Sequence, residues 1–186
     1  MVRLALPPLV GLSVVLVLSA CSSASDPSAS PAAAGQIDGL VTYTDLARDH
    51  VDSEVDYPQL PPVGGAHDPA WLTCTGTVYD EPVRDENAVH SMEHGAVWVT
   101  YQPDLPKDQV AALAGVVEGT PYSLLSPYPG IDSPVVLTAW GVQLSVDSAT
   151  DQRVAEFVAE FANGPQTPEP GASCDGGVEM GDTHSG

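Results

Sequence analysis

The sequence predicts a small α+β domain, with a mostly antiparallel sheet, two helices on one face, and a long Pro- and Gly-rich N-terminal loop. Two segments carry apolar residues at helical spacing, and several short segments are rich in branched and aromatic residues. These segments follow one another in the order strand, helix, strands, helix. Because each helix has one apolar face, both helices are expected to pack on the sheet.

The two helices are predicted at residues 107–118 and 150–162. The first follows Pro106 and ends at Gly119, and its apolar residues recur at i, i+3 and i+7: Val110, Leu113 and Val117. The second ends just before Gly164. Its cap candidates are Asp147 and Ser148, and one face carries Val154, Phe157, Val158 and Phe161.

Strands are predicted where branched and aromatic residues lie between Gly, Pro and Asp: at 75–79, 96–101, 122–125, 134–140 and 141–146. The first of them closes a segment, 57–80, that is rich in proline and glycine. We predict a long ordered loop there, and such loops on small scaffolds are often functional.

The first twenty residues predict a lipoprotein signal peptide. Arg3 precedes an apolar stretch at 4–18 that is too short to span a membrane comfortably, and the small residues before Cys21 are typical of a cleavage site. Leu-Ser-Ala-Cys resembles the bacterial lipobox, whose cysteine is acylated. We therefore expect a protein anchored by lipid to the outer face of the cytoplasmic membrane, the alternative being an ordinary signal peptide with an incidental cysteine.

The rest of the chain divides into a tether, one domain and a tail. Residues 21–35 consist mainly of Ser, Ala and Pro, which predicts a flexible tether. Residues 36–174 are predicted to form a single domain. Residues 175–186 predict a disordered tail, which carries Met180 and His184 as two further metal-ligand candidates.

The charge is strongly negative: 25 Asp and Glu residues against 5 Lys and Arg give a net charge of −20. Such a field repels nucleic acid and anionic lipid surfaces and concentrates cations. Nucleic acid is therefore excluded as a partner. Acidity alone, however, is only weak support for a cation site.

Two cysteines remain once Cys21 is assigned to lipid: Cys74 and Cys174. Outside the membrane such a pair usually forms a disulfide, which here would join the early loop to the end of the domain. The alternative is a pair of thiolate metal ligands, although metal pairs usually have closer spacing.

The densest chemical pattern is His-Ser-Met-Glu-His at residues 90–94, preceded by His67 in a Gly-Gly-Ala-His-Asp-Pro segment. On a helix it matches the inverted zincin motif, with Glu93 as general base. On an extended segment His90, Met92 and His94 would share one face. Gly95 and a strand-like run follow at once, which favours the extended form.

Two imidazoles and a thioether, completed by His67, suit copper first and zinc second. A zinc-dependent hydrolase that uses Glu93 is a lesser alternative. Such an enzyme needs a third metal ligand, usually a distant carboxylate on a second helix, and the sequence offers none that can be identified. The remaining alternative is a structural or interaction protein whose histidines form a hydrogen-bond network.

Several motifs together resemble the family called domain of unknown function 3105. They are residues 61–67, 76–80 with Pro82, 89–95, 138–141 and 164–174, so the resemblance spans almost the whole predicted domain. It implies an exported or membrane-tethered bacterial protein but no activity. It singles out His67, His90, Glu93, His94, Glu169 and Cys174, and Met92 replaces a more usual leucine.

The sequence thus predicts an extracytoplasmic lipoprotein that binds a transition metal through His67, His90, His94 and Met92. Its role would be delivery or sequestration of copper or zinc, and not turnover of a substrate. The expected partners are membrane lipid, through Cys21, and another exported metal-handling protein.

Overall fold

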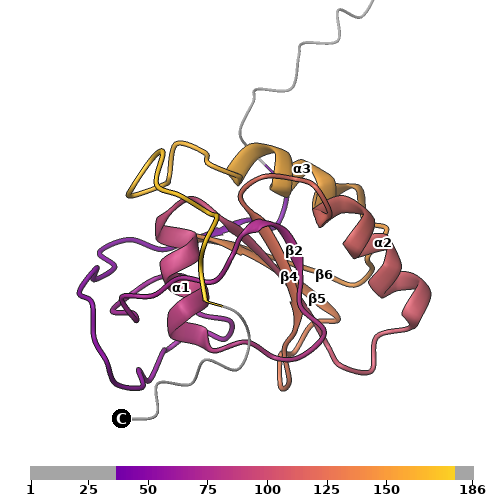
Figure 1. Ribbon diagram of the computed structural model, residues 1–186. Coiled ribbons are helices and arrows are strands. Elements are labelled where there is room, and N and C mark those ends of the chain that lie inside the picture. Colours follow the sequence, from indigo (N-terminus) through magenta and orange to yellow (C-terminus); the bar gives the residue numbers. More distant parts are fainter. Residues whose placement is uncertain (1–36, 179–186) are drawn as a thin grey trace, which may run out of the picture. The chain divides into compact units, whose positions relative to one another are not determined.

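The computed structural model describes residues 37–178 (Figure 1). The predicted signal peptide, the acylated Cys21, the tether at 21–35, and Met180 and His184 of the tail lie outside the described residues. Within residues 37–178 no helix is both long and apolar enough to cross a membrane.

Six strands form one sheet in the order β1-β6-β5-β3-β4-β2. The strands are β1 (Val41–Thr42), β2 (Thr75–Val78), β3 (Val97–Tyr101), β4 (Ser123–Pro127), β5 (Val135–Ala139) and β6 (Val142–Val146). The helices are α1 (Asp85–Glu93), α2 (Lys107–Val117) and α3 (Gln152–Phe161).

The sheet is mixed but mostly antiparallel, as predicted. The pairs β1–β6, β5–β6 and β3–β5 are antiparallel, whereas β3–β4 and β2–β4 are parallel. The parallel pair β3–β4 is joined through α2, because parallel neighbours need a crossover connection. The α+β class and five of the strands were predicted, whereas the two-residue edge strand β1 was not.

Helices α2 and α3 cover one face of the sheet, and α1 lies on the other face with the long loops (Figure 1). Apolar residues of α2 and α3 pack on β3, β5 and β6 in one buried cluster. A second cluster joins Val89 and Met92 of α1 to Trp98, Leu124 and Trp140. The sheet is therefore covered on both faces, and the histidine-bearing segment is part of the second layer.

Helix α1 corrects our preference for an extended His-Ser-Met-Glu-His segment. The helix ends in a Schellman arrangement, in which the Gly95 N–H donates to the Met92 carbonyl (3.0 Å) and the Ala96 N–H donates to the Ser91 carbonyl (2.9 Å). Gly95 adopts a φ of 109°, which suits glycine. Gly95 thus ends the helix and turns the chain within two residues, so that β3 can follow at Val97.

The structure also differs from the prediction at the start of α3 and at the end of the domain. The N-cap of α3 is Asp151, whose side chain accepts a hydrogen bond from the Arg153 N–H, in place of Asp147 or Ser148. Residues 175–178 of the predicted tail are ordered. The Val178 N–H donates to the Trp71 carbonyl at 2.8 Å, and Val178 forms a bridge with Leu72.

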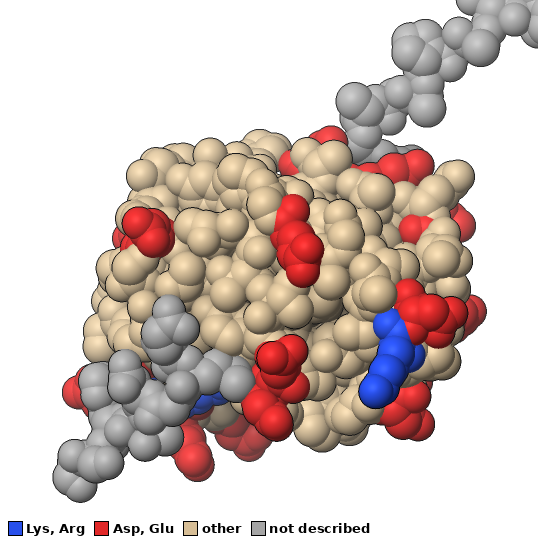
Figure 2. Space-filling model, turned by 45° about the vertical axis from the view of Figure 1, so that its right-hand side comes forward, with Lys and Arg blue, Asp and Glu red and all other residues tan. Residues whose placement is uncertain are grey.

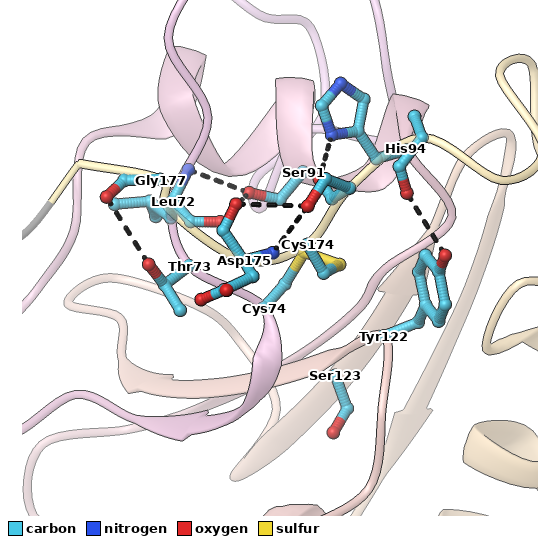
Figure 3. Close-up of a disulfide and its surroundings, with 12 residues drawn as sticks. Leu72, Thr73, Cys74, Ser91, His94, Tyr122, Ser123, Cys174, Asp175 and Gly177 are labelled. Atoms are coloured by element: carbon cyan, nitrogen blue, oxygen red, sulfur yellow. Dashed lines mark hydrogen bonds between the residues drawn. A yellow bond between two sulfur atoms is a disulfide. The ribbon is translucent and has the colours of Figure 1, made fainter.

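Cys74 and Cys174 form a disulfide, as predicted, so the thiolate-pair alternative is wrong (Figure 3). The Cys74 N–H also donates to the Cys174 carbonyl at 2.9 Å. The Ser91 hydroxyl of α1 donates to the Leu72 carbonyl at 2.9 Å, close to the disulfide. The C-terminal segment is thereby held against the segment before β2 and beside α1.

Asp85 at the start of α1 gives a testable pH dependence. Burial raises the pKa of Asp85 from 3.8 to about 6, although the Tyr128 hydroxyl donates to its Oδ2 at 2.8 Å and opposes the shift. The native state then binds more protons than the unfolded state between about pH 4 and pH 6, so this group lowers the free energy of unfolding as pH rises through that window.

We expect Asp85→Asn to remove this contribution, since Asn keeps an acceptor for Tyr128 but does not titrate. The measurement is chemical denaturation of both proteins from about pH 4 to pH 7 in the presence of a chelator. Between those limits the variant should gain stability relative to the wild type by on the order of 1 kcal/mol. Parallel pH profiles for the two proteins would contradict the assignment.

Candidate metal centre

Four side chains converge at one end of α1: His50, His67, His90 and Glu93. Each offers one ligand atom, and these atoms all lie within 4.8 Å of one another. His67, His90 and Glu93 are buried, with 0%, 5% and 2% exposure, whereas His50 is exposed. Three imidazoles and one carboxylate are a donor set that suits borderline transition-metal ions.

His50 and His67 are brought together by a short parallel bridge between two loop segments. The Val51 N–H donates to the His67 carbonyl at 2.7 Å, and the His67 N–H donates to the Asp49 carbonyl at 2.9 Å. The two rings lie edge to face with centroids 4.8 Å apart. The backbone pairing therefore fixes the backbone positions from which both side chains extend.

Gly64 lets the loop before His67 adopt its shape. Its φ is 134°, and a Cβ atom there would lie 2.9 Å from a Leu46 methyl group and 3.2 Å from the Trp140 ring. Only glycine fits such a position without displacing its neighbours.

His90 and Glu93 come from α1, where residues three apart lie on one face. His94 is four residues after His90, but it is not part of the group of four. Met92 is fully buried in the hydrophobic cluster with Trp98 and Leu124. The helical geometry therefore pairs His90 with Glu93 and assigns Met92 to the core.

Backbone carbonyls orient both buried imidazoles. The Nδ1 of His67 lies 2.8 Å from the Gly65 carbonyl, and the Nδ1 of His90 lies 2.7 Å from the Asp68 carbonyl. Because a carbonyl can only accept, each Nδ1 carries a proton, and each Nε2 is the ring nitrogen that can bind a metal ion. Histidine ligands of metals typically make this contact through their second nitrogen.

The Nε2 of His67 is buried and has no hydrogen-bond partner, although it lies 2.8 Å from Oε2 of Glu93. Nitrogen and carboxylate oxygen at this distance need a cation, either a proton on Nε2 or a metal ion bound by both atoms. Such a contact is unfavourable unless a positive charge lies on or between the two groups. A bound cation would satisfy both atoms at once.

His90 is suited to bind a metal as a neutral ligand. Burial lowers the pKa of His90 to about 4, the hydrogen bond to Asp68 opposes the shift, and the neighbouring histidines lower it further. Its imidazole is therefore neutral near pH 7, so a metal does not have to displace a proton from it.

The Arg84 guanidinium holds the segment that orients His90. Its Nη1 lies 2.5 Å from Oδ2 of Asp68, and its Nε lies 3.0 Å from Oε2 of Glu86. The Asp68 carboxylate also accepts a hydrogen bond from the Ala70 N–H at 2.8 Å. Because the backbone carbonyl of Asp68 orients the His90 ring, the ion pair between Arg84 and the Asp68 carboxylate helps to hold His90 in position.

We expect Arg84→Gln to weaken metal affinity by about tenfold to a hundredfold, the usual cost of losing a group that orients a ligand. Calorimetric titration with Zn²⁺ measures the change. Arg153→Gln is the matched control, because Arg153 forms a similar ion pair with Asp151 at the start of α3. Equal affinities for the two variants would contradict the role of Arg84.

His94 and Glu169 form a neighbouring pair. The Nδ1 of His94 lies 2.7 Å from the Ser173 carbonyl, and its Nε2 lies 3.8 Å from Oε2 of Glu169, whose side chain is half exposed. Figure 3 shows His94 beside the disulfide segment. The structure thus places His94 and Glu169 together but outside the group of four.

His50 is the ligand candidate that sequence reasoning missed. It lies outside the two histidine-rich motifs, in the segment Arg48-Asp49-His50-Val51-Asp52. One available signal was that it is a histidine in an otherwise acidic segment of an ordered loop. Pairing with His67, however, depends on a bridge that no local pattern indicates.

The comparisons with known proteins identify the family. The family model described as "Protein of unknown function (DUF3105)" matches residues 50–176, more than half of the chain. The chain belongs to this family. The match begins at His50 and contains all four members of the metal-ligand group. No curated protein and no solved structure matches the chain.

Acidic side chains dominate the charged surface of this DUF3105 protein. Figure 2 shows one face on which Asp and Glu side chains are dispersed and basic side chains are few. This follows from the excess of 25 acidic over 5 basic residues. A negative field of this kind raises the local concentration of cations.

Proposed function

We propose that this protein is an extracytoplasmic, lipid-anchored carrier or scavenger of a divalent transition-metal ion. The ion would be held by the Nε2 atoms of His50, His67 and His90 and a carboxylate oxygen of Glu93. The observation that carries the proposal is the convergence of these four ligand atoms within 4.8 Å of one another, with the buried Nε2 of His67 at 2.8 Å from Oε2 of Glu93. A metal ion bound by both atoms would neutralise the buried carboxylate and use the Nε2 lone pair as a ligand.

The donor set favours Cu(II) first and Zn(II) second. Three imidazoles and a carboxylate are borderline to hard donors, and among divalent ions Cu(II) binds such sites most strongly. The thioether of Met92, a soft donor that would suit Cu(I), packs in the core and is not a ligand. Cu(II) and Zn(II) are therefore the ions to test.

The arrangement supports binding more than hydrolysis. The zincin-type alternative needs His90 and His94 as ligands and Glu93 as a base beside a metal-bound water. Here Glu93 is itself among the convergent ligand atoms and His94 is outside them. A site with four protein donors leaves no open position for a catalytic water in a four-coordinate ion, as in sites that structure a metal.

The location of the protein is also a proposal, supported by the signal-like residues 1–20, the lipobox-like residues before Cys21, and the disulfide between Cys74 and Cys174. Disulfides persist in oxidising compartments, which agrees with export. Incorporation of labelled palmitate that is lost in Cys21→Ser would support lipidation. An unlabelled wild-type protein would contradict it.

The test of the metal proposal is elemental analysis of the whole chain, purified in detergent, after separate titrations with Cu(II) and Zn(II) and removal of free ion. We expect one tightly held ion per chain, and no retention of Mg²⁺ or Ca²⁺, which prefer oxygen ligands. A chain that retains neither Cu(II) nor Zn(II) would overturn the proposal and leave the histidines as a structural network.

A further inference from the structure

The four members of the ligand group are not equivalent, and the difference lies in His50. The side chain of His50 is 47% exposed, whereas those of His67 and Glu93 are 0% and 3% exposed. His67 and His90 are each fixed through Nδ1 to a backbone carbonyl. Among residues 37–178 neither ring nitrogen of His50 is hydrogen-bonded to a backbone carbonyl. Its Nε2 lies 3.7 Å from Oε2 of Glu93.

The backbone of His50 is nevertheless held in place. The flanking residues Asp49 and Val51 are hydrogen-bonded to the backbone of His67, so the Cα of His50 is fixed while its side chain is not. The imidazole can therefore rotate away from the group by changing its side-chain torsions alone. No backbone hydrogen bond has to break for this movement.

The His50 ring also forms the outer layer of the group. It stacks on the His90 ring, with centroids 4.9 Å apart and planes inclined by 26°. The inner rings are packed against other aromatic side chains. The ring centroids of His67 and Trp140 are 5.9 Å apart, and those of His90 and Trp71 are 5.7 Å apart. The solvent-facing side of the group is therefore the side on which His50 lies.

From this asymmetry we infer that His50 is the exchangeable ligand, and that the ion enters and leaves past its side chain. The inference rests on the proposed metal function. In the exchange step the metal–Nε2 bond to His50 breaks as a donor atom of an acceptor binds the ion. His67, His90 and Glu93 retain the ion until the acceptor supplies further donors. The partner that fits this side is one that presents an exposed imidazole, thiolate or carboxylate.

The experiment follows transfer of Zn²⁺ from the loaded whole chain to the chromogenic chelator pyridylazoresorcinol. The chelator acts as the acceptor, and transfer is read as a rate at increasing chelator concentration. We expect His50→Ala to retain one ion per chain but to release it about tenfold faster or more, since loss of a group that merely orients a ligand already weakens binding by that factor. His50→Asp, which restores a donor, should slow the release again.

Two variants make the result specific. His94→Ala removes a neighbouring histidine outside the group and should release Zn²⁺ at the wild-type rate. His67→Asn should retain no stoichiometric ion. Release from His50→Ala at the wild-type rate, or failure of His50→Ala to retain an ion at all, would overturn the exchange role and leave the metal function intact. A wild-type chain without bound ion would overturn both.

Discussion

Replacement of His67 by asparagine is expected to abolish stoichiometric metal binding while leaving the fold unchanged. The amide nitrogen of asparagine can take the place of Nδ1 and donate to the Gly65 carbonyl, but the side chain has nothing equivalent to Nε2. The variant therefore removes one buried ligand and preserves the contact that orders the loop. We expect affinity for Zn²⁺ or Cu(II) to fall by more than about a hundredfold.

The same variant separates metal binding from folding. An ion present at about a thousand times its Kd raises the free energy of unfolding by about 4 kcal/mol, and His67→Asn should lose this increment. Without metal its stability should not exceed that of the wild type, because the substitution removes the 2.8 Å contact between Nε2 of His67 and the buried carboxylate of Glu93.

His94→Asn is the matched control for this prediction. His94 is also buried and its Nδ1 also faces a carbonyl, that of Ser173, but its ring is outside the group of four. The control should keep both the bound ion and the stabilisation that the ion provides. Equal loss of metal in the two asparagine variants would show that the assigned ligand set is wrong.

Removal of the disulfide is expected to have the largest effect on stability. Cys74 and Cys174 are 100 residues apart in sequence, and closing a loop of that length stabilises the folded state by about 4.7 kcal/mol on the chain-entropy model. We expect the double variant Cys74→Ala, Cys174→Ala to lose about 3–5 kcal/mol in chemical denaturation. This is a large part of the stability of a typical domain, which is about 5–15 kcal/mol.

The reduced wild-type chain provides the comparison for the disulfide, since it should unfold at the same denaturant concentration as the double variant. Metal affinity of the folded double variant should remain close to that of the wild type, because no member of the ligand group lies in the C-terminal segment. A loss of stability below about 1 kcal/mol would contradict the stabilising role of the crosslink.

The elements that the sequence predicted well are those whose signals are local. Helices α2 and α3 have one apolar stripe each and clear end signals, and the strands of the central sheet are rich in branched residues between turn residues. For α1 the sequence signal is different, and it favours an extended segment. Since α1 is buried from Glu86 to Glu93, polar as well as apolar residues lie in the interior, and the spacing of its apolar residues alone does not indicate a helix.

Gly95 held the information that would have corrected this prediction. A glycine just after a short polar segment is a common helix end, and the Schellman arrangement at Gly95 and Ala96 needs only two residues before the next strand. The strand-like residues that follow therefore do not argue against a helix. Once α1 is helical, His90 and Glu93 share a face and Met92 turns into the core.

The sequence by itself determined the class of fold, the disulfide partners, and the expectation that the histidine-rich motifs near His67 and His90 carry a metal site. Only the tertiary structure decided the ligand set. It brought His50 beside His67 through a backbone bridge and left His94 outside the group. The physical reason is that local patterns record which residues repeat at a given spacing, whereas coordination depends on where side chains from separate segments point after packing.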